Sequence, residues 1–454
     1  MSERTIAAIA TPLGEGGISV IRISGEDAIS VADKCFCAFS GEKLAALEGY
    51  RAAYGKVTDA QDGTIDDAVA LVFRAPKSYT GENIVEISVH GGTVIARQVM
   101  RRVLECGAIL ATGGEFTKRA FLNGKLDLTK AESVMGLISA RSDAAAKISR
   151  SARDGRISRD TETILNKLLE TAASLAAFAD YPDEDIPNLN EENFLSLLDD
   201  CYTKCEKLIS TYDTGRIIRE GINCAIVGKP NVGKSSLMNL LCGSNRSIVT
   251  DIAGTTRDVV ETTVSVGDVI LNLADTAGIH DTDDTVEKFG VSKAKEKIDN
   301  AELLLAVFDS SSTIDLDDKK LLDSIRDKKC IVILNKSDLA PAFDKKDLVD
   351  FETIEISARD GNGYKELCDT IARVCKTDML SPDDTVLINE RQRDCVNRAL
   401  GAVCAARDAL LCGVTLDAVG VCIDDAIAAL LELTGKRVTN EVCDEIFKRF
   451  CVGK

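Results

Sequence analysis

The stretch that decides the fold is Gly228-Lys229-Pro230-Asn231-Val232-Gly233-Lys234-Ser235, a G-x-x-x-x-G-K-S loop. An apolar run at 222–227 precedes it and predicts a strand, and a helix-forming run at 235–241 follows it. The motif binds phosphate in this strand–loop–helix context, because its backbone N–H groups and the positive end of the helix attract anionic oxygens. We expect Lys234 to reach the β- and γ-phosphates and Ser235 to ligate Mg²⁺.

Two further motifs follow predicted strands. Asp275-Thr276-Ala277-Gly278 comes after the run at 269–274, where a metal-linked carboxylate and a γ-phosphate sensor belong. Asn335-Lys336-Ser337-Asp338 comes after the run at 330–334. Its terminal carboxylate can accept both N–H donors of guanine, which adenine lacks, and a site built on such bonds rejects the wrong base.

Two shorter motifs complete the set. In Gly254-Thr255-Thr256-Arg257-Asp258, Thr256 suits Mg²⁺ and the γ-phosphate, and Ser357-Ala358-Arg359 can cover the base. Five motifs in this order predict a domain that binds and hydrolyses GTP. The residues predicted to contact GTP are Asn231, Val232, Gly233, Lys234, Ser235, Ser236, Thr250, Asp251, Ile252, Ala253, Gly254, Thr255, Thr256, Asp275, Thr276, Ala277, Gly278, Asn335, Lys336, Ser337, Asp338, Ser357, Ala358 and Arg359.

The charge that builds between the phosphates during hydrolysis must be offset by a cation, and the sequence shows no obvious arginine finger. A monovalent cation held by Asn231 and the segment 250–255 is one candidate. The alternative, that Asn231 only shapes the loop, is equally compatible with the spacing.

Three zones of composition indicate the domain organisation. Residues 1–120 contain short β-like runs, at 18–23, 68–73 and 84–89, and a helix is expected after Gly91-Gly92, which together predict an α+β domain. Residues 121–220 have helical spacing, interrupted by an acidic loop at 181–187.

Residues 221–378 alternate strands with helices, which predicts a mostly parallel sheet in a Ras-like α/β domain. Its strands are expected at 222–227, 258–266, 269–274, 303–309 and 330–334, with a hairpin turn at Gly267-Asp268. Residues 379–454 return to helix. We therefore expect the α/β domain to be inserted into an all-α domain made of 121–220 and 379–454.

Composition narrows the class of protein. Over 454 residues no apolar run is long enough to cross a membrane, and no signal-peptide pattern opens the chain, so a cytoplasmic location is expected. The 16 cysteines form no C-x-x-C pair and are expected to be reduced thiols, and the presence of only two histidines disfavours a multi-histidine metal site. The net charge is −18, yet residues 97–160 carry thirteen Lys and Arg against seven Asp and Glu. This segment is either a solvated helical surface or a docking surface for an anionic partner.

With these residues assembled, the chain resembles the tRNA modification GTPase family known as MnmE or TrmE. The likeness spans essentially the whole chain. It is carried by Ala10-Thr11-Pro12, Gly16-Gly17-Ile18, Arg22-Ile23-Ser24-Gly25, Tyr79-Thr80-Gly81-Glu82, His90-Gly91-Gly92, the run from Gly114 to Leu128, and the ending Phe450-Cys451-Val452-Gly453-Lys454.

The resemblance implies a homodimer whose N-terminal domain, residues 1–120, binds a tetrahydrofolate derivative, 5,10-methylene- or 5-formyl-tetrahydrofolate. It implies nucleotide domains that meet in trans when GTP is bound, and a heterotetramer with a subunit that binds FAD and NADH. Together the two proteins would add an aminomethyl or carboxymethylaminomethyl group to carbon 5 of the wobble uridine of certain tRNAs.

The resemblance also assigns roles to individual residues. Folate contacts would come from Arg22, Glu86, Lys125 and Lys454, and K⁺ ligands from Asn231, Thr250, Ile252 and Thr255. Glu287 would orient the attacking water, and Cys451 matches a cysteine associated with the modification reaction. Taken alone, Glu287 is typical of a solvated helix residue and Cys451 of a buried thiol.

The chain departs from the family pattern at three positions. His280 stands where the family usually has Arg, Gly113 replaces a usual Pro, and Val452 replaces a usual Ile. Any ion pair that this arginine makes in other members of the family is not expected with His280 in its place.

Two other functions remain open. A regulatory or ribosome-assembly GTPase, which binds RNA without modifying it, shares the nucleotide motifs but does not explain the motifs in 1–125 or the Cys-x-Gly-Lys ending. A membrane-remodelling GTPase would need an anchor that the sequence lacks.

Overall fold

The computed structural model describes residues 4–180, 191–243, 262–273, 298–379, 384–448, 450 and 452–453. By its internal contacts the chain divides into two compact units. One contains Met1–Met135, Arg153–Tyr202 and Arg398–Lys454, and the other contains Gly136–Ala152 and Thr203–Asn397. None of the helices in the described ranges is both long enough and apolar enough to span a membrane.

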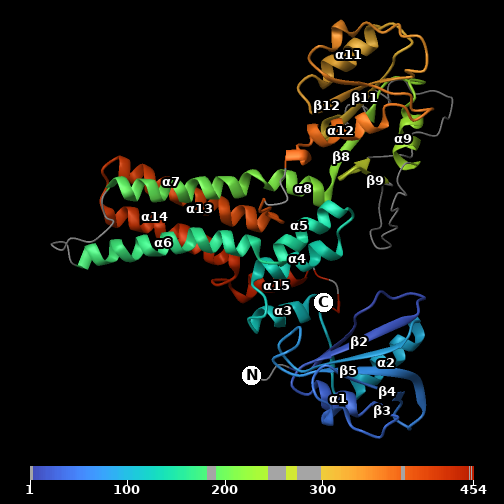
Figure 1. The fold of residues 1–454 in the computed structure, drawn as a ribbon, viewed down its shortest axis with the longest axis vertical. Helices are drawn as coiled ribbons and strands as arrows, with labels where there is room; N and C mark the ends of the chain where they lie inside the picture. The colour runs from blue at the N-terminus through green and yellow to red at the C-terminus, as the bar shows by residue number, and fades with distance from the viewer. Residues whose placement is uncertain are drawn as a thin grey trace. The chain divides into compact units, whose positions relative to one another are not determined.

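The N-terminal part is an α+β fold around a seven-stranded sheet (Figure 1), in the order β3-β4-β5-β6-β2-β1-β7. Neighbouring strands are antiparallel except for β1 and β7, which are parallel. The elements are β1 (Ile6–Ile9), β2 (Ile18–Ser24), α1 (Ala28–Asp33), β3 (Phe36–Ala38), β4 (Arg51–Thr58), β5 (Thr64–Phe73), β6 (Ile84–His90), α2 (Thr93–Glu105), β7 (Ile109–Leu110) and α3 (Glu115–Leu122).

One face of this sheet is apolar and buried under α1 and α2. Along β2, Ile21 and Ile23 point into the core while Arg22 between them is only half-buried on the opposite face, as the two-residue period of a strand requires. The core continues through Val85 and Ile87 of β6 and Val99 of α2. The opposite face therefore carries the polar side chains that can meet a ligand.

The helical part includes long helices that run side by side (Figure 1). Its elements are α4 (Leu128–Ile138), α5 (Asp143–Arg153), α6 (Arg156–Asp180), α7 (Glu191–Ser210), α8 (Tyr212–Glu220), α13 (Glu390–Leu411), α14 (Leu416–Thr434) and α15 (Asn440–Lys448). Helix α14 packs on α6. Arg407 of α13 pairs with Asp199 of α7 at 3.0 Å, and Arg398 pairs with Glu432 of α14 at 2.8 Å.

The α/β part has a six-stranded sheet in the order β13-β12-β11-β8-β10-β9, parallel except for the β9–β10 hairpin. Its elements are β8 (Ile222–Val227), α9 (Lys234–Gly243), β9 (Thr262–Val266), β10 (Val269–Leu273), β11 (Leu303–Asp309), α11 (Leu316–Ile325), β12 (Cys330–Asn335), β13 (Glu352–Glu355) and α12 (Tyr364–Val374). The combination of α+β, all-α and α/β folds predicted from the sequence is confirmed.

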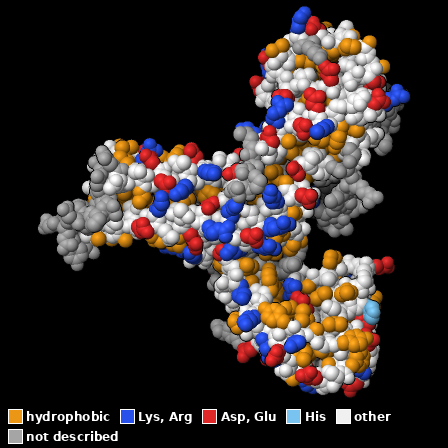
Figure 2. All heavy atoms as spheres, in the orientation of Figure 1, with side chains coloured by type: hydrophobic (Ala, Val, Ile, Leu, Met, Phe, Trp, Pro, Cys, Tyr) orange, Lys and Arg blue, Asp and Glu red, His pale blue; other side chains and the backbone are white. Residues whose placement is uncertain are grey.

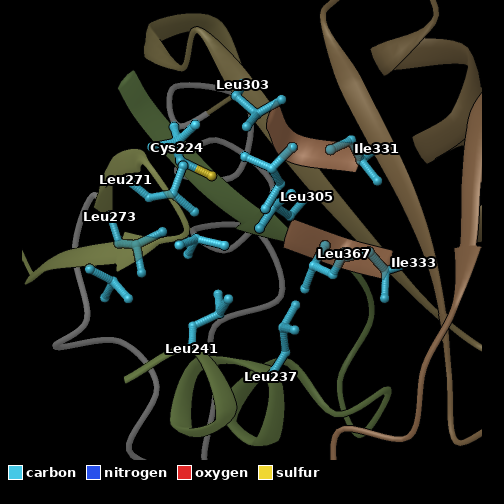
Figure 3. Packing of buried hydrophobic residues seen from close by; sticks show 14 of the residues in the cluster. Cys224, Leu237, Leu241, Leu271, Leu273, Leu303, Leu305, Ile331, Ile333 and Leu367 are labelled. Carbon is cyan, nitrogen blue, oxygen red and sulfur yellow. The ribbon is translucent and has the colours of Figure 1, made fainter. Parts of the chain in front are cut away.

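Both faces of this parallel sheet are buried, which explains its nearly continuous apolar strands. On one face, Leu237 and Leu241 of α9 pack toward Leu271 of β10 and Leu305 of β11 (Figure 3). On the other, Phe308 and Leu334 pack with residues of α11. This core holds β8 and α9 rigidly, so the loop that joins them has fixed ends.

Candidate functional site

The phosphate-binding loop joins β8 to α9 through backbone angles that favour glycine. Gly228 has φ +150°, and a Cβ there would lie 2.4 Å from the carbonyl oxygen of Val307 in β11. Gly233 has φ +97°, and Asn231 has φ +63°, a region that Asn tolerates better than most residues. The loop is thus wrapped tightly against the sheet at its first glycine.

Lys234 begins α9, and its side chain lies across the loop. Its Nζ donates hydrogen bonds to the carbonyl oxygens of Gly228 at 3.0 Å and Lys229 at 2.6 Å. The half-buried ammonium is therefore held over the turn whose amides we expect to surround phosphate. Ser235 and Ser236 are exposed in the first turn of α9.

One side chain connects three of the predicted motifs. Asn335 Nδ2 donates to the carbonyl oxygen of Val232 at 2.8 Å, and its Oδ1 accepts from the backbone N–H of Ala358 at 2.9 Å. Asn335 is only 3% exposed, so both bonds are made in a buried setting, where leaving such groups unpaired is costly. The structure thus brings the phosphate loop, Asn335–Asp338 and Ser357–Arg359 together.

Beside this junction lies an open pocket of about 710 Å³. Gly233 and Asn239 line one side, and Asn335, Asp338 and Arg359 line another. Asp338 and Arg359 are exposed, so both can reach a ligand in the pocket. At these positions the sequence predicts a carboxylate that reads guanine and a segment, Ser357-Ala358-Arg359, that covers the base.

Lys336 has a partner that the sequence did not reveal. Its Nζ donates to Asp309 Oδ2 at 2.5 Å, and Asp309 Oδ1 accepts from the backbone and the hydroxyl of Ser311. Burial acts to raise the pKa of Asp309, but the bonds from Lys336 and Ser311 outweigh it and hold that pKa below its usual value. Asp309 is the register partner of Asn335 in the parallel ladder, a pairing for which the sequence carries no spacing signal.

Several predicted site residues lie outside the described residues. These are Thr250, Asp251, Ile252, Ala253, Gly254, Thr255, Thr256, Asp275, Thr276, Ala277, Gly278, Glu287, Cys451 and Lys454, together with the departure at His280 and the predicted loop at 181–187.

A second cluster of predicted residues lies on the N-terminal sheet. Arg22 of β2 and Glu86 of β6 are cross-strand partners, and Arg22 Nε donates to Glu86 Oε1 at 2.8 Å. Arg22 also donates to the carbonyl oxygen of Gly453 at 3.1 Å, and its guanidinium lies 5.8 and 5.7 Å from the ring centres of Tyr79 and Phe116. Two predicted folate contacts are thus neighbours.

Lys125 is exposed and reaches the same region through a loop. Its Nζ donates to the carbonyl oxygen of Pro76 at 3.0 Å, in the loop that also carries Tyr79. Burial raises the pKa of Tyr79, whose hydroxyl pairs with that of Thr117 at 2.9 Å. Tyr79 and Phe116 were not predicted as contacts, although both occur in stretches that carry the family resemblance.

The basic segment 97–160 is not one uniform surface. Many of its cations pair with carboxylates: Arg102 with Glu105, Lys118 with Asp444, Arg119 with Glu82 and Glu115, Lys130 with Asp127, and Arg153 with Asp154. In α5, Lys147 and Arg150 are exposed, and neither pairs with a carboxylate within the described part of the chain. If this segment docks an anion, Lys147 and Arg150 are available to contact it.

The chain matches two known families by sequence. The family described as "GTP-binding protein TrmE N-terminus" matches residues 5–125, and the one described as "MnmE helical domain" matches residues 128–451. Together they cover the sheet with Arg22 and the helices that precede and follow the phosphate-loop domain in the sequence.

Relatives that match the whole chain belong to the same family as these two models. The tRNA modification GTPase MnmE of Desulforamulus reducens is 41% identical over 100% of both chains, and that of Clostridioides difficile is 39% identical over 99% of both. The MnmE of Lactobacillus acidophilus is 40% identical over 99% of this chain and 98% of its own.

Among solved structures, a variant of Era from Aquifex aeolicus bound to GDP·AlF4⁻ is 28% identical over 40% of this chain and 66% of its own, with a TM-score of 0.27, which is too low to bear on the fold. Identity over the full length, together with the arrangement of the phosphate loop, Asn335 and Asp338, establishes that the chain belongs to the MnmE family of tRNA modification GTPases.

Proposed function

We propose that this GTP hydrolase acts with an FAD-dependent subunit to add an aminomethyl or carboxymethylaminomethyl group to carbon 5 of the wobble uridine of certain tRNAs. The observation that carries the GTP part is the Asn335 junction, because one buried amide ties the phosphate loop to both base-reading motifs. The tRNA part rests on the whole-chain relatives, which are all named as tRNA modification GTPases.

In this proposal each part of the nucleotide site has one task. Lys234 and the loop amides bind the β- and γ-phosphates, and Asp338 accepts both N–H donors of guanine. Ser235 and Thr256 hold Mg²⁺, whose chemistry is to neutralise phosphate charge. The exposed Ser235 hydroxyl at the start of α9 fits that ion. Glu287 orients the attacking water.

Potassium would take a second position beside the phosphates. Asn231, with Thr250, Ile252 and Thr255, offers the oxygen ligands that a hard cation prefers. Asn231 is exposed and has φ +63°, so its side-chain oxygen is accessible to a ligand. The cation would offset the negative charge that builds between the phosphates during hydrolysis, because the sequence shows no obvious arginine finger to do so.

The cluster around Arg22 suits a folate. Glu86 supplies acceptors for a hydrogen-bonding heterocycle, Arg22, Lys125 and Lys454 supply cations for carboxylates, and the ring faces of Tyr79 and Phe116 border the guanidinium. When bound, 5,10-methylene- or 5-formyl-tetrahydrofolate supplies the one-carbon unit. Cys451 belongs to the same C-terminal segment as Gly453, which contacts Arg22, and would take part in the transfer.

The proposed assembly is a cytoplasmic homodimer joined to the FAD- and NADH-binding subunit as a heterotetramer. Three domains divide the work: residues 1–120 bind folate and dimerise, 121–220 with 379–454 form the helical domain, and 221–378 hydrolyse GTP. Binding of GTP would bring the nucleotide domains together, and hydrolysis would release them, which is an order–disorder switch of a familiar kind.

The test uses cells that lack the chain and are complemented with wild type, Asp338→Asn or Asp323→Asn. Mass spectrometry of tRNA nucleosides should show unmodified wobble uridine without the chain and restored modification with wild type. Asp338→Asn should fail to restore it and should prefer xanthosine triphosphate in vitro, because the amide reverses one hydrogen bond to the base. Asp323 is an exposed α11 carboxylate outside the pocket lining and serves as the control.

The regulatory or ribosome-assembly alternative makes a different prediction. It expects normal wobble uridines in cells without the chain, together with a purified protein that still binds GTP. That result would remove the modification proposal and leave the nucleotide site intact.

A further inference from the structure

The second residue of the phosphate loop has an ion pair that no motif predicts. Lys229 Nζ donates to Asp315 Oδ2 at 2.5 Å and to Asp318 Oδ2 at 2.7 Å. Both carboxylates belong to the start of α11, which lies beside β11 in the same α/β part (Figure 1). The loop is therefore attached to a helix that no nucleotide motif includes.

Hydrogen bonds within α11 hold the two carboxylates in place independently of Lys229. Asp315 is the N-cap of α11 and accepts from the backbone N–H groups of Asp317 and Asp318, while Asp318 accepts from the N–H of Asp315 at 3.1 Å. This reciprocal pattern is a capping box, which locks both side chains. Lys229 thus gains two charged acceptors without the entropy cost of ordering them.

The pair is also partly shielded from water. The side chain of Asp318 is 6% exposed and that of Lys229 is 30% exposed. Burial acts to lower the pKa of Lys229, but the hydrogen bonds that it donates to both carboxylates, together with their charges, outweigh burial and raise that pKa above its usual value. An exposed pair on the same helix turn provides the contrast: Lys320 and Asp317 meet at 2.8 Å with side chains 77% and 70% exposed.

The backbone of Lys229 serves the site directly. Its carbonyl oxygen accepts from Lys234 Nζ at 2.6 Å, closer than the carbonyl oxygen of Gly228 at 3.0 Å. On the other side, Gly228 is pressed against Val307 of β11. The sheet therefore fixes the position of Gly228, and α11 fixes the position of Lys229. Because Lys234 donates to the carbonyl oxygens of both residues, the position of its ammonium depends on the sheet and on α11.

We propose that Lys229 is a positioning residue for nucleotide phosphates. Its ion pair with Asp315 and Asp318 holds the first turn of the loop in the shape that presents Lys234 and the loop amides to the β-phosphate. The inference rests on the proposed binding of GTP by this loop. It gives α11 a role in nucleotide affinity, although the sequence of α11 contains no nucleotide-binding motif.

The experiment compares full-length wild type with Lys229→Met, Lys229→Arg and Lys320→Met. Dissociation of a fluorescent GDP analogue, KM and kcat for GTP, and the melting temperature without nucleotide are measured in Mg²⁺ and K⁺. Lys229→Met should release GDP about tenfold faster and raise KM about tenfold, with kcat within about twofold, because it removes binding common to ground and transition states. Lys320→Met should match wild type.

Lys229→Arg should stay within about threefold of wild type, because a guanidinium can bond both carboxylates. If Lys229→Met does not fold, Asp315→Asn replaces it, since Asn keeps the N-cap oxygen but removes the charge. That variant should still raise the GDP dissociation rate about threefold at an unchanged melting temperature.

Unchanged GDP release in whichever of these two variants is used, or equal weakening in Lys320→Met, overturns the positioning role. So does a loss of kcat at unchanged KM. A wild-type protein that does not bind GDP at all would instead overturn the proposed function, so the two failures are separate results.

Discussion

Gly233 occupies a place in the phosphate loop where a methyl group has no room. Its φ is +97°, and an added Cβ would lie 2.1 Å from Asn335 Nδ2. Asn335 cannot move aside cheaply, because it is buried and bonded to Val232 and Ala358. We predict that Gly233→Ala costs about 1–3 kcal/mol of unfolding free energy and weakens GDP binding at least about tenfold.

Chemical denaturation and GDP titration measure the two effects. The matched control is Gly401→Ala in the middle of α13, where nothing lies within 4 Å of the new Cβ, so it should be neutral or slightly stabilising. A Gly233→Ala protein with wild-type GDP affinity would show that the Asn335 junction does not shape the phosphate loop.

His90 provides a pH-dependent contact on the N-terminal sheet. Its Nδ1 lies 2.8 Å from Asp66 Oδ1, and the hydrogen bond and charge of Asp66 raise the pKa of His90 above 6.5. A raised folded-state pKa means that the contact stabilises the fold fully below about pH 6.5 and loses this effect as pH rises through the raised value. Wild type should therefore exceed Asp66→Asn in melting temperature more at pH 5.5 than at pH 8.5.

Asp66→Asn is the suitable variant, because its remaining oxygen can still accept from the backbone N–H of His90. An NMR titration should show the pKa of His90 falling in this variant. If the melting-temperature difference is the same at both pH values, the ion pair contributes nothing to stability.

At the residue scale, the sequence predicted the motif residues but not the residues that bond to them and hold them in place. Asp338 and Lys234 could be predicted as ligand contacts because each belongs to a spaced motif at a strand end. Asp309 and Asp315 could not be predicted, because their roles depend on the register of β11 beside β12 and on where α11 begins. Such contacts join segments that have no spacing relation in the sequence.

At the scale of elements, strands with strong apolar runs were predicted closely. The strands at 222–227 and 303–309 have the predicted bounds, and the hairpin at Gly267-Asp268 is confirmed. The predictions did not include β1, β3, β4 or β7. Strand β4, Arg51–Thr58, contains Ala, Gly and Lys, which are weak strand formers, so its pairing with β5 outweighs its local preference.

Helix α5 carries a testable anion-binding face. Ala145, Ser149 and Ala152 are buried, which leaves Lys147 and Arg150 on the exposed side of α5, and Figure 2 shows Lys and Arg side chains on the surface of the helical part. If the proposed substrate is tRNA, its phosphates should meet these cations despite the net charge of −18. We predict that Lys147→Gln with Arg150→Gln weakens tRNA binding about tenfold.

Binding is measured by filter retention over a range of salt concentrations. Each lost phosphate contact should reduce the slope of log affinity against log salt by about one unit. Lys365→Gln, which removes an exposed cation from α12, should change neither quantity. Equal tRNA affinity in the α5 variant and wild type would place the RNA elsewhere.

At the scale of the whole molecule, the C-terminal segment contacts the N-terminal sheet. Gly453 bonds to Arg22, and Val452 forms a bridge with Gly113, so the C-terminal segment completes the N-terminal sheet region. A Cβ on Gly453 would lie 2.7 Å from the carbonyl oxygen of Ile9, which explains a glycine there. No local pattern predicts a contact across more than four hundred residues, and only the family resemblance indicated that this ending had a role.

Under the proposed function, potassium would connect the nucleotide site to the assembly, because the cation would complete a site that is used when two nucleotide domains meet. Without a cation between the phosphates, the charge of the transition state is left uncompensated. We predict that replacing K⁺ by Na⁺ slows GTP hydrolysis at least about tenfold, since one missing stabilising charge or donor costs about that much or more. The affinity for GDP should change little, because the proposed contacts to its phosphates come from Lys234 and the loop amides.

Hydrolysis is measured at several protein concentrations in KCl, NaCl and RbCl at equal ionic strength. Rubidium, which is close to potassium in size, should restore most of the hydrolysis rate. If nucleotide domains from two copies must meet, the hydrolysis rate per molecule should rise with protein concentration. Asn231→Ala should abolish the difference between K⁺ and Na⁺, whereas a variant that still distinguishes the two ions would exclude Asn231 as a ligand. Equal rates in KCl and NaCl for the wild type would mean that this chain offsets the phosphate charge by a residue of its own.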